Sequence, residues 1–290
     1  MNYQISKLPP GVYLVATPIG RARDITLHAL DVLASADVLA AEDTRNLRKL
    51  MELHGVPLAG RRILAYHDHN GARMRPQLLQ ALDEGKSIAY ASDAGTPLVA
   101  DPGHGLAVGA RAEGHLVTTA PGPSAAIAAL TIAGLASDRF LFAGFAPNAS
   151  AARRRFLEGF RDVEATLIFY ESPKRAADML AEAADVLGGN RRAALCRELT
   201  KKFEDVVPGT LKELAEHFAA TPPRGECVVL IEKGLAETAT ETDIDGALRK
   251  ALETMRMKDA ATAVAGALNL PRRDVYQRAL ALAKEGDGAG

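Results

Sequence analysis

The stretch Ser-Asp-Ala-Gly-Thr-Pro at residues 92–97 decides the fold of this chain because of the strand that comes before it. Residues 87–91, Ser-Ile-Ala-Tyr-Ala, read as a short buried strand. A strand that ends in small residues, Gly and Pro makes a loop whose backbone can approach a ligand closely, and Asp93 adds a carboxylate there. Similar loops follow other strand-like runs, at residues 17–20, 42–45 and 121–124. This recurrence predicts a set of ligand-facing loops at the carboxyl ends of strands.

Strand-like apolar runs alternate with helical periods through the first four-fifths of the chain. The expected strands are residues 12–16, 37–41, 63–65, 87–91, 116–119, 140–143, 166–170, 193–197 and 228–232. The helices expected between them are residues 26–35, 44–54, 72–84, 105–113, 124–133, 151–160 and 174–187. The alternation predicts an α/β fold of two domains, with mainly parallel sheets that helices cover on both faces.

The stiff sequence Pro121-Gly122-Pro123 predicts a boundary between two α/β domains, residues 1–121 and 122–235, with a ligand in the cleft between them. After a polar linker at residues 236–242, we expect residues 243–290 to form a small helical segment. Its helices are predicted at residues 244–255, 258–267 and 272–283, and the last two have the length and turn of a helix-turn-helix. A helical cap or a dimer brace is the alternative for this segment.

The chain has 290 residues, with 35 Lys and Arg against 36 Asp and Glu, so its formal net charge is −1. No global positive field attracts nucleic acid, and any such binding depends on local basic groups. Cys196 and Cys227 lie in apolar runs without a Cys/His cluster, which predicts buried thiols and no metal site. Because we find neither a leader pattern nor an apolar run that could span a bilayer, we expect a cytoplasmic protein without a membrane partner.

The loops lack the glycine patterns of the common nucleotide sites. A dinucleotide-binding fold carries Gly-x-Gly-x-x-Gly after its first strand, whereas the first strand here runs into Ala-Thr-Pro-Ile-Gly at residues 16–20. No Walker A sequence occurs in the chain either. These observations disfavour a dinucleotide or phosphate-loop function.

A set of sequence blocks resembles the class III, or tetrapyrrole-methylase-type, S-adenosylmethionine methyltransferases. Within that superfamily the chain is most similar to enzymes that methylate a ribose 2′-oxygen of ribosomal RNA. The blocks follow the family's order over roughly residues 10–235, and their combination is far more specific than any single block. They are residues 14–20, 24–26, 40–45, 67–70, 92–103, 121–126, 142–147, 171–175 and 197–201.

The resemblance implies a two-domain α/β fold, S-adenosyl-L-methionine bound in the cleft between the domains, and a homodimer. Carried over block by block, it also implies which residues meet this methyl donor. They are Pro18, Ser92, Asp93, Ala94, Gly95, Thr96, Pro97, Ser124, Ala125 and Phe145. Asp93 either holds a polar group of the donor or braces its own loop, and both interpretations stay open at this point.

Three charged residues at one strand end are candidates for the chemistry of methyl transfer. The positively charged sulfur of the donor already activates the methyl group, so the protein must chiefly align that group with its acceptor. A ribose hydroxyl is a weak nucleophile, and a proton acceptor or a nearby cation helps its attack. Glu42 and Asp43 beside Arg45 would supply a base and a substrate clamp. The alternative is an acid pair at a helix N-terminus with a surface ion partner.

Residues of other matching blocks are candidates for contacts with RNA: His67, Asn70, Lys174, Arg197 and Lys201. Arg21 is a further candidate, because it departs from the family's pattern after Gly20 and adds a charge suited to RNA. The plainer alternatives are a solvated helix face for the cations and a helix N-cap for Asn70. The run His-Asp-His at residues 67–69 resembles a zinc cluster at first sight, but neighbouring side chains on a strand point to opposite faces. We therefore expect no bound metal.

The resemblance implies methylation of a cytidine ribose 2′-oxygen in 16S ribosomal RNA, in the decoding centre. The partner is either the free 16S ribosomal RNA or the small ribosomal subunit. One alternative is a tetrapyrrole (precorrin-type) small-molecule methyltransferase, which uses the same kind of donor site. Another is a non-catalytic RNA-binding or assembly protein. The basic loops and the helical C-terminal segment favour RNA over a macrocycle, because a macrocycle requires neither.

Overall fold

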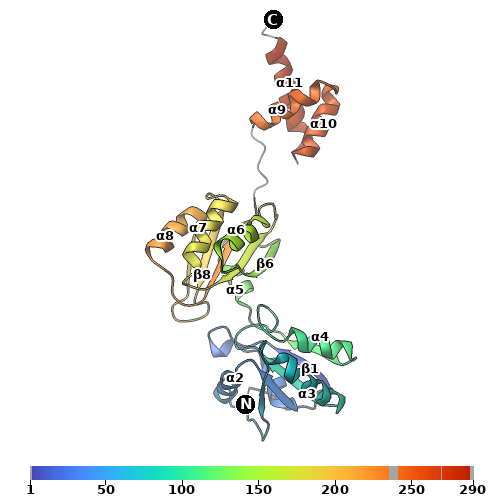
Figure 1. Ribbon diagram of the computed structural model, residues 1–290, viewed down its shortest axis with the longest axis vertical. Coiled ribbons are helices and arrows are strands. Elements are labelled where there is room, and N and C mark those ends of the chain that lie inside the picture. Colours follow the sequence, from blue (N-terminus) through green and yellow to red (C-terminus); the bar gives the residue numbers. More distant parts are fainter. Residues whose placement is uncertain (1, 235–240, 269, 288–290) are drawn as a thin grey trace. The chain divides into compact units, whose positions relative to one another are not determined.

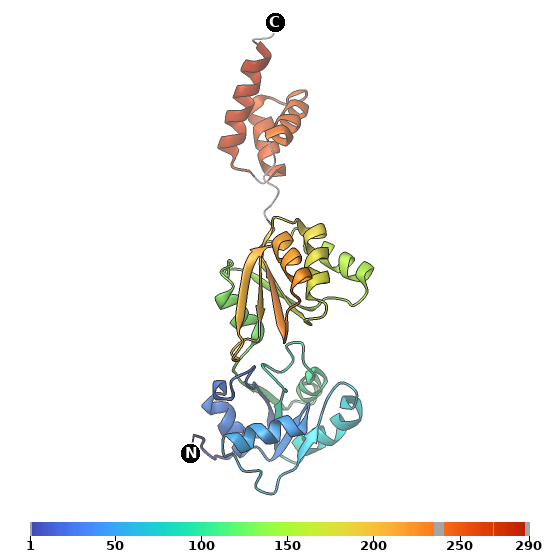
Figure 2. The ribbon, with the colours of Figure 1, turned by 90° about the vertical axis from the view of Figure 1, so that its left-hand side faces the viewer.

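The computed structural model describes residues 2–234, 241–268 and 270–287, and Figures 1 and 2 show its ribbon. Contacts between residues divide the chain into two units, Met1–Lys233 and Gly234–Gly290. The larger unit contains two five-stranded sheets. We call residues 2–120, built on the first sheet, the first lobe, and residues 121–234, built on the second, the second lobe. The domain boundaries predicted near residues 121 and 235 stay predictions.

The five strands of the first lobe are parallel, as the alternation of strands and helices predicts. Their order in the sheet is β3-β2-β4-β1-β5. The central strands are continuous apolar runs because both of their faces are buried under helices. The strands are β1 (Gly11–Val15), β2 (Val38–Ala41), β3 (Ile63–Ala65), β4 (Ser87–Ala91) and β5 (Leu116–Ala120).

Side chains alternate between the two faces of this sheet, so each face has its own core. Tyr13 packs with α1 (Leu27–Ser35) and α2 (Thr44–Leu53) on one face. Tyr90 packs with α3 (Gly71–Asp83) and α4 (His104–Ala112) on the other face. A short 3-10 helix, Ala22–Asp24, precedes α1. Because β2, β4 and β1 are neighbours in the sheet, the loops that follow them lie side by side.

The second sheet differs from the mainly parallel sheets expected from the sequence. Its order is β6-β7-β10-β8-β9, and only the β6–β7 pair is parallel. β10 is antiparallel to both β7 and β8, and β8 is antiparallel to β9. The physical reason is that β8 and β9 form a hairpin, after which the chain returns through the middle of the sheet. The strands are β6 (Phe140–Phe145), β7 (Thr166–Glu171), β8 (Arg192–Arg197), β9 (Asp205–Thr210) and β10 (Cys227–Ile231).

Two elements of the second lobe escape prediction from the sequence, β9 and α8 (Leu211–Ala220). β9 contains Pro208 and Gly209, which interrupt a strand pattern, and it tolerates the proline because it is the edge strand of its sheet. α8 does carry a sequence signal, the capping box formed by Thr210 and Glu213.

Helices cover both faces of the second sheet as well. α6 (Ser150–Glu158), α7 (Ala176–Leu187) and α8 pack on one face, around Phe169. α5 (Ala125–Ile132) packs on the other face, against Ile168 and Leu230. Ile19 of the first lobe also packs against this second core, so the two lobes are in contact there.

The smaller unit contains α9 (Glu241–Leu252), α10 (Met257–Ala267) and α11 (Arg272–Asp287), which confirms the helical segment expected after the linker. Its core includes Leu248, Val264 and Val275. Arg278 of α11 forms an ion pair with Asp245 of α9, with 2.6 Å between Nη2 and Oδ2. Residues 235–240, most of the predicted linker, lie outside the described residues. In the described ranges no helix combines the length and the apolar character needed to cross a membrane.

Candidate functional site

Two hydrogen bonds tie the loop after β4 to the loop after β1. The Thr17 N–H donates to the Gly95 carbonyl oxygen (2.9 Å), and the Gly95 N–H donates to the Thr17 carbonyl oxygen (3.0 Å). The buried hydroxyl of Ser92 also donates to the Gly95 oxygen, at 2.7 Å. Gly95 has a φ of +83°, a left-handed conformation that favours glycine. Residues 92–97 therefore form a loop whose conformation is fixed by hydrogen bonds within the loop and to the loop after β1.

A third loop, between β5 and α5, joins this pair. The Thr96 hydroxyl donates to the Pro123 carbonyl oxygen at 2.9 Å. In the first turn of α5, the Ala126 N–H donates to the hydroxyl oxygen of Tyr170 on β7, at 3.1 Å. These bonds bring the loops after β1, β4 and β5 together where the first lobe meets the second.

The loops form one wall of a cavity of about 360 Å³, a volume typical of small-ligand sites. The opposite wall comes from the second lobe, with Tyr170 and Cys227 among its residues. The ring of Phe145 is 56 % exposed and lies edge to face against Tyr170, with 5.7 Å between the ring centroids. Six residues predicted to meet the methyl donor line this main cavity: Ala94, Gly95, Thr96, Ser124, Ala125 and Phe145.

Three other residues predicted for the donor, Pro18, Ser92 and Asp93, line a neighbouring cavity of about 190 Å³ on the α2 side. The Asp93 carboxylate braces α2, because it accepts hydrogen bonds from the backbone N–H of Asp43 (2.9 Å) and from the Asn46 amide (3.1 Å). These bonds join Asp93 to the start of α2 and not to its own loop. Both interpretations from the sequence, bracing of its own loop and contact with the donor, stay predictions. Pro97 lines neither of these two cavities.

Asp43 and Arg45 form an exposed ion pair at the start of α2. Asp43 is the N-cap residue, and its carboxylate accepts hydrogen bonds from the Arg45 N–H (2.8 Å) and from the Arg45 guanidinium (2.6 Å). The bonds to Arg45 lower the pKa of Asp43 to about 2. The Arg45 side chain is 88 % exposed, and neither residue lines either cavity. This geometry is that of a helix N-terminus with a surface partner, and catalytic roles for the pair stay predictions.

Glu42, which precedes this pair, has a different environment. Its side chain is partly buried, and burial together with the carboxylates of Asp93 and Asp68 raises its pKa. Glu42 therefore holds a proton more tightly than Asp43 does. It is not part of the lining of either cavity, so its role as a proton acceptor also stays a prediction.

Two residues predicted to contact RNA already hold parts of the protein together. Arg21 Nε donates to the carbonyl oxygen of Thr200 at 2.9 Å, which joins the loop after β1 to the turn after β8. Lys201, in the same turn, forms ion pairs with Glu198 (2.9 Å) and Glu226 (2.8 Å). Both cations therefore contribute to the contact between the lobes or to the shape of this turn.

The remaining candidates for RNA contacts lie in three different settings. The Asn70 side chain accepts a hydrogen bond from the His67 N–H (2.9 Å) and makes no cap bond to α3, so it fixes the His67 loop. Arg197 forms an ion pair with Asp205, at 3.1 Å. Lys174 is exposed and directly follows a segment that lines the main cavity. Lys174 is thus the candidate with the clearest access to a large substrate.

Asp101 lines the main cavity and is a functional candidate that the sequence pattern does not single out. Burial, and then the nearby carboxylates of Glu42 and Asp93, raise its pKa to about 7. It lies within the matching block at residues 92–103, but composition alone does not reveal that its side chain is partly buried beside other acids. Sequence reasoning could have included it only as one more acidic residue of a ligand-facing loop.

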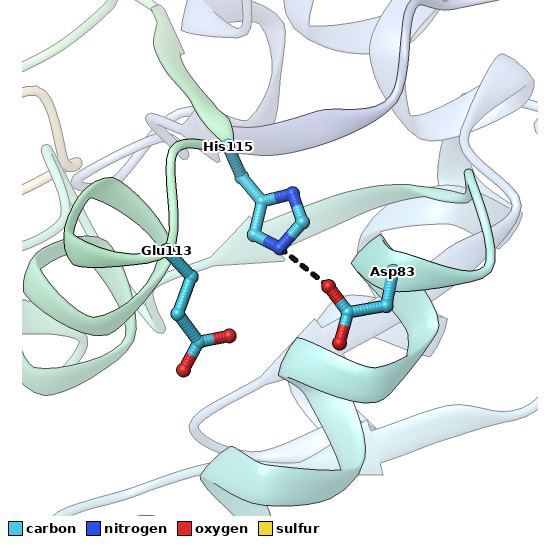
Figure 3. A group of neighbouring side chains, drawn as sticks. All are labelled: Asp83, Glu113 and His115. Atoms are coloured by element: carbon cyan, nitrogen blue, oxygen red, sulfur yellow. Dashed lines mark ion pairs between the residues drawn. The ribbon is translucent and has the colours of Figure 1, made fainter.

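A separate group of polar side chains lies at the other end of the first sheet, where the strands begin. Asp83 ends α3, Glu113 follows α4 and His115 precedes β5, and one possible ligand atom from each lies within 4.8 Å of the others (Figure 3). His115 Nε2 is 3.1 Å from Asp83 Oδ1, which is an ion pair when the ring is protonated. Both acids are exposed. The group therefore ties the ends of α3 and α4 together, away from both cavities.

Comparison with known proteins identifies the family of this chain. Residues 11–215 match the Tetrapyrrole (Corrin/Porphyrin) Methylases, and residues 238–283 match the RsmI C-terminal HTH domain. The chain is 47 % identical to the ribosomal RNA small subunit methyltransferase I of Mesorhizobium japonicum, over 97 % of this chain and 96 % of that protein. It is 45 % identical to the protein of the same name from Erythrobacter litoralis, over 97 % of this chain and 98 % of that protein.

A solved structure shares the fold at lower identity. The uroporphyrin-III C-methyltransferase of Thermus thermophilus, complexed with S-adenosyl homocysteine, matches with a TM-score of 0.54 and 22 % identity. The match covers 77 % of this chain and 98 % of that one, and at this identity it shows the fold alone. The family match and the relatives, by contrast, span most of the chain. The chain belongs to the tetrapyrrole methylase family and, within it, to the ribosomal RNA small subunit methyltransferase I proteins.

Proposed function

We propose that this protein transfers a methyl group from S-adenosyl-L-methionine to the ribose 2′-oxygen of a cytidine in 16S ribosomal RNA, in the decoding centre. The observation that carries the proposal is the main cavity, built by three interlocked loops in a chain of this family. Relatives that match over nearly their whole length bear the name ribosomal RNA small subunit methyltransferase I. We infer that the reaction takes place in the cytoplasm, where bacterial ribosomal subunits are made.

The residues of the main cavity fit a methyl donor that carries positive charge. Its lining includes three carboxylates, Asp101, Glu171 and Glu226, and neither Lys nor Arg. When bound, S-adenosylmethionine supplies a methyl group that its positively charged sulfur has already activated. The backbone of residues 94–96 and the Ser124 hydroxyl offer hydrogen bonds to polar atoms of such a ligand. The other residues predicted for the donor, namely Pro18, Ser92, Asp93 and Pro97, are proposed to keep this wall in shape.

Contacts with RNA are proposed at exposed basic side chains, because the chain as a whole is nearly neutral. Lys174 is exposed beside the main cavity, and Arg272 and Arg273 are exposed at the start of α11. The match to the RsmI C-terminal HTH domain includes these two arginines, and the second helix of such a motif commonly contacts nucleic acid. Arg21, Arg197 and Lys201 already have partners within the protein. We therefore propose that they hold the loops beside the cavity in shape and do not bind RNA directly.

A homodimer is part of the proposal. Large apolar side chains are exposed on β5, α5 and β6: Leu116, Ile127, Ile132 and Phe140. β5 and β6 are also edge strands of their sheets, and an edge strand leaves backbone hydrogen-bonding groups unpaired along one side. Contact with a second copy of the chain would cover such a surface.

The proposal is tested with methyl-labelled S-adenosylmethionine and small ribosomal subunits that lack their normal ribose methylation. After incubation with the purified protein, the labelled nucleotide is mapped in the extracted 16S RNA. We expect label on the 2′-oxygen of one cytidine, and none on subunits that are already methylated. Free 16S RNA assayed in parallel identifies the form of the substrate. Light scattering of the same preparation is expected to give the mass of two chains.

Two results would contradict the proposal in different ways. Donor binding without label on RNA would favour a tetrapyrrole (precorrin-type) methyltransferase, and the same labelled donor would then be offered with tetrapyrroles. RNA binding without donor binding would favour a non-catalytic assembly protein. A mass of one chain would remove the homodimer and leave the reaction itself untouched.

A further inference from the structure

Asp101 lies in the wall of the main cavity, in the loop between β4 and α4. Its side chain is partly buried, and within the described residues no hydrogen bond or ion pair reaches its carboxylate. The other two carboxylates of the cavity have partners. Glu171 pairs with Arg175 at 3.0 Å, and Glu226 pairs with Lys201 at 2.8 Å. Asp101 is therefore the carboxylate of this cavity that can exchange a proton without breaking an ion pair.

The groups whose charges interact with that of Asp101 are acidic or phenolic. The guanidinium of Arg75, on α3, lies against Gly105 in the first turn of α4. Burial has the largest effect on the pKa of Asp101, and the negative charges of Glu42, at the end of β2, and Asp93, after β4, raise the pKa further, to about 7. Tyr90 on β4 and Tyr170 on β7 also interact with its charge. A general base is most effective when its pKa lies near the working pH. The surroundings of Asp101 therefore suit a group that accepts and releases a proton.

The backbone holds Asp101 in a fixed position. Leu98 and Ala100 have φ values of +72° and +60°, in the left-handed region that these residue types rarely adopt. Gly103, with a φ of +115°, lies so close to the core that a Cβ atom there would be 2.6 Å from the Tyr90 ring. Such conformations persist only where the surrounding structure enforces them, and they cluster at functional sites. The loop thus presents the Asp101 carboxylate to the cavity in a defined place.

We propose that Asp101 accepts the proton of the ribose hydroxyl during methyl transfer, an inference that rests on the function proposed above. The ribose 2′-oxygen forms its bond to the methyl carbon and gives up its proton to a carboxylate oxygen of Asp101. The electron pair of the broken sulfur–carbon bond stays on the sulfur of the donor. Asp101 then releases the proton to water, so the step needs no further reactant.

Glu42 is the competing candidate, because its pKa is also raised and its sequence block matches the family. Glu42 does not line the main cavity, however, and its negative charge acts on Asp101. Removing that charge should therefore lower the pKa of Asp101 and leave the proton acceptor in place. Asp43 is poorly suited to the role, because hydrogen bonds from Arg45 lower its pKa to about 2.

The test compares wild type, Asp101→Asn and Glu42→Gln in the subunit methylation assay from about pH 5 to about pH 9. In the wild type we expect kcat/KM, which reports the pKa of the free enzyme, to fall roughly tenfold per pH unit below about pH 7, because a protonated Asp101 cannot accept a proton. Asp101→Asn should lower kcat by roughly 100- to 10,000-fold and abolish this pH dependence, with unchanged donor affinity. Glu42→Gln should stay active and show the fall in kcat/KM at lower pH.

Two further variants separate the role of the carboxylate from the shape of the loop. Asp101→Glu keeps a carboxylate and should retain part of the rate together with the pH dependence. Glu84→Gln removes an exposed acid, paired with Lys86 just before β4 begins, and should change neither rate nor pH dependence. It controls for the loss of one negative charge from the first lobe.

The outcomes distinguish the inference from the function on which it rests. Asp101 is not the proton acceptor if Asp101→Asn keeps the wild-type kcat, or if this variant loses its affinity for the donor. The assignment moves to Glu42 if Glu42→Gln, and not Asp101→Asn, abolishes the pH dependence. If the wild type places no label on RNA, the proposed function fails before any variant is compared.

Discussion

Asp43 and Asp101 show that the environment of a side chain, and not its type, sets its acid–base chemistry. Both belong to the first lobe and lie in loops that follow neighbouring strands, β2 and β4. Hydrogen bonds from Arg45 lower the pKa of Asp43 to about 2, whereas burial and nearby carboxylates raise that of Asp101 to about 7. At neutral pH, Asp43 is a fixed charge and Asp101 is a group that titrates.

Asp101→Asn is expected to raise the Tm at about pH 8 and to have little effect on it at about pH 4. The folded-state pKa of Asp101 lies above its value of about 4 in the unfolded chain, so the ionised carboxyl destabilises the fold. The protonated carboxyl of Asp101 does not destabilise the fold, so the wild type is fully stable in this respect below about pH 4. Its free energy of unfolding falls as the pH rises from about 4 to about 7, and the loss is constant above that range. Asparagine has no such loss, so the difference in Tm, measured by calorimetry, should grow with pH. A difference that is the same at all pH values would contradict this account.

At the residue scale, the sequence can identify positions but not environments. The chemistry of the loop after β4 is predictable at Gly95 and Thr96, because a strand that ends in small residues must turn there. The partners of Arg21 and Lys201 are not predictable, because the Thr200 carbonyl and the carboxylates that bind these cations come from other segments of the chain. The same limit applies to Asp101, whose burial depends on the folded surroundings.

At the scale of elements, the loop after β4 depends on the backbone conformation of Gly95. Its φ of +83° allows the two hydrogen bonds to Thr17 that join the loops. A Cβ atom on Gly95 would lie 3.4 Å from Ile19 and 3.6 Å from the Pro123 oxygen, which leaves enough space for a methyl group. Any penalty of a substitution here therefore comes from the backbone and not from a collision.

Gly95→Ala is expected to weaken donor binding on the order of tenfold. An alanine in the left-handed conformation costs roughly 1–2 kcal/mol, and if the backbone leaves that conformation to avoid this cost, the loop that forms the cavity wall moves. Titration calorimetry with S-adenosylmethionine measures the change in affinity. Gly85→Ala is the matched control, since Gly85 also has a positive φ of +77°, has open space around a Cβ and lies in the turn before β4. It should cost similar stability and leave the affinity unchanged. Equal donor affinities for the two variants would show that this conformation does not shape the cavity.

The two sheets differ in how well the sequence predicts them, for a physical reason. In a parallel sheet with helices on both faces, the central strands are apolar throughout, and β1, β2 and β4 could be found in this way. The edge strands β3 and β5 are less buried, so their pattern is weaker. β9 pairs along one side only and accepts Pro208, so its pattern is weak. The direction of β10 depends on the path of the chain through α8. The residues of β10 are apolar in either direction, so they do not predict whether the strand is parallel or antiparallel.

At the scale of the whole molecule, the smaller unit is expected to serve recognition of RNA and not methyl transfer. The double variant Arg272→Glu with Arg273→Glu should raise KM for the small subunit on the order of tenfold, with unchanged kcat and donor affinity. The dependence of KM on salt should also become weaker, because fewer phosphates are contacted. Lys212→Glu with Arg111→Glu, which reverses two exposed charges on α8 and α4, is the control. Equal effects of the two double variants would contradict a specific role for α11.

The order of strands in the second sheet has a consequence for the synthesis of this chain on the ribosome. The first lobe ends at residue 120, so all of its strands are available while the rest is still being translated. The second lobe must wait, because its last strand, β10, occupies the place between β7 and β8. Until β10 emerges, both neighbours keep an open edge that can pair with other nascent chains. Protection by chaperones during translation should therefore matter for the second lobe far more than for the first.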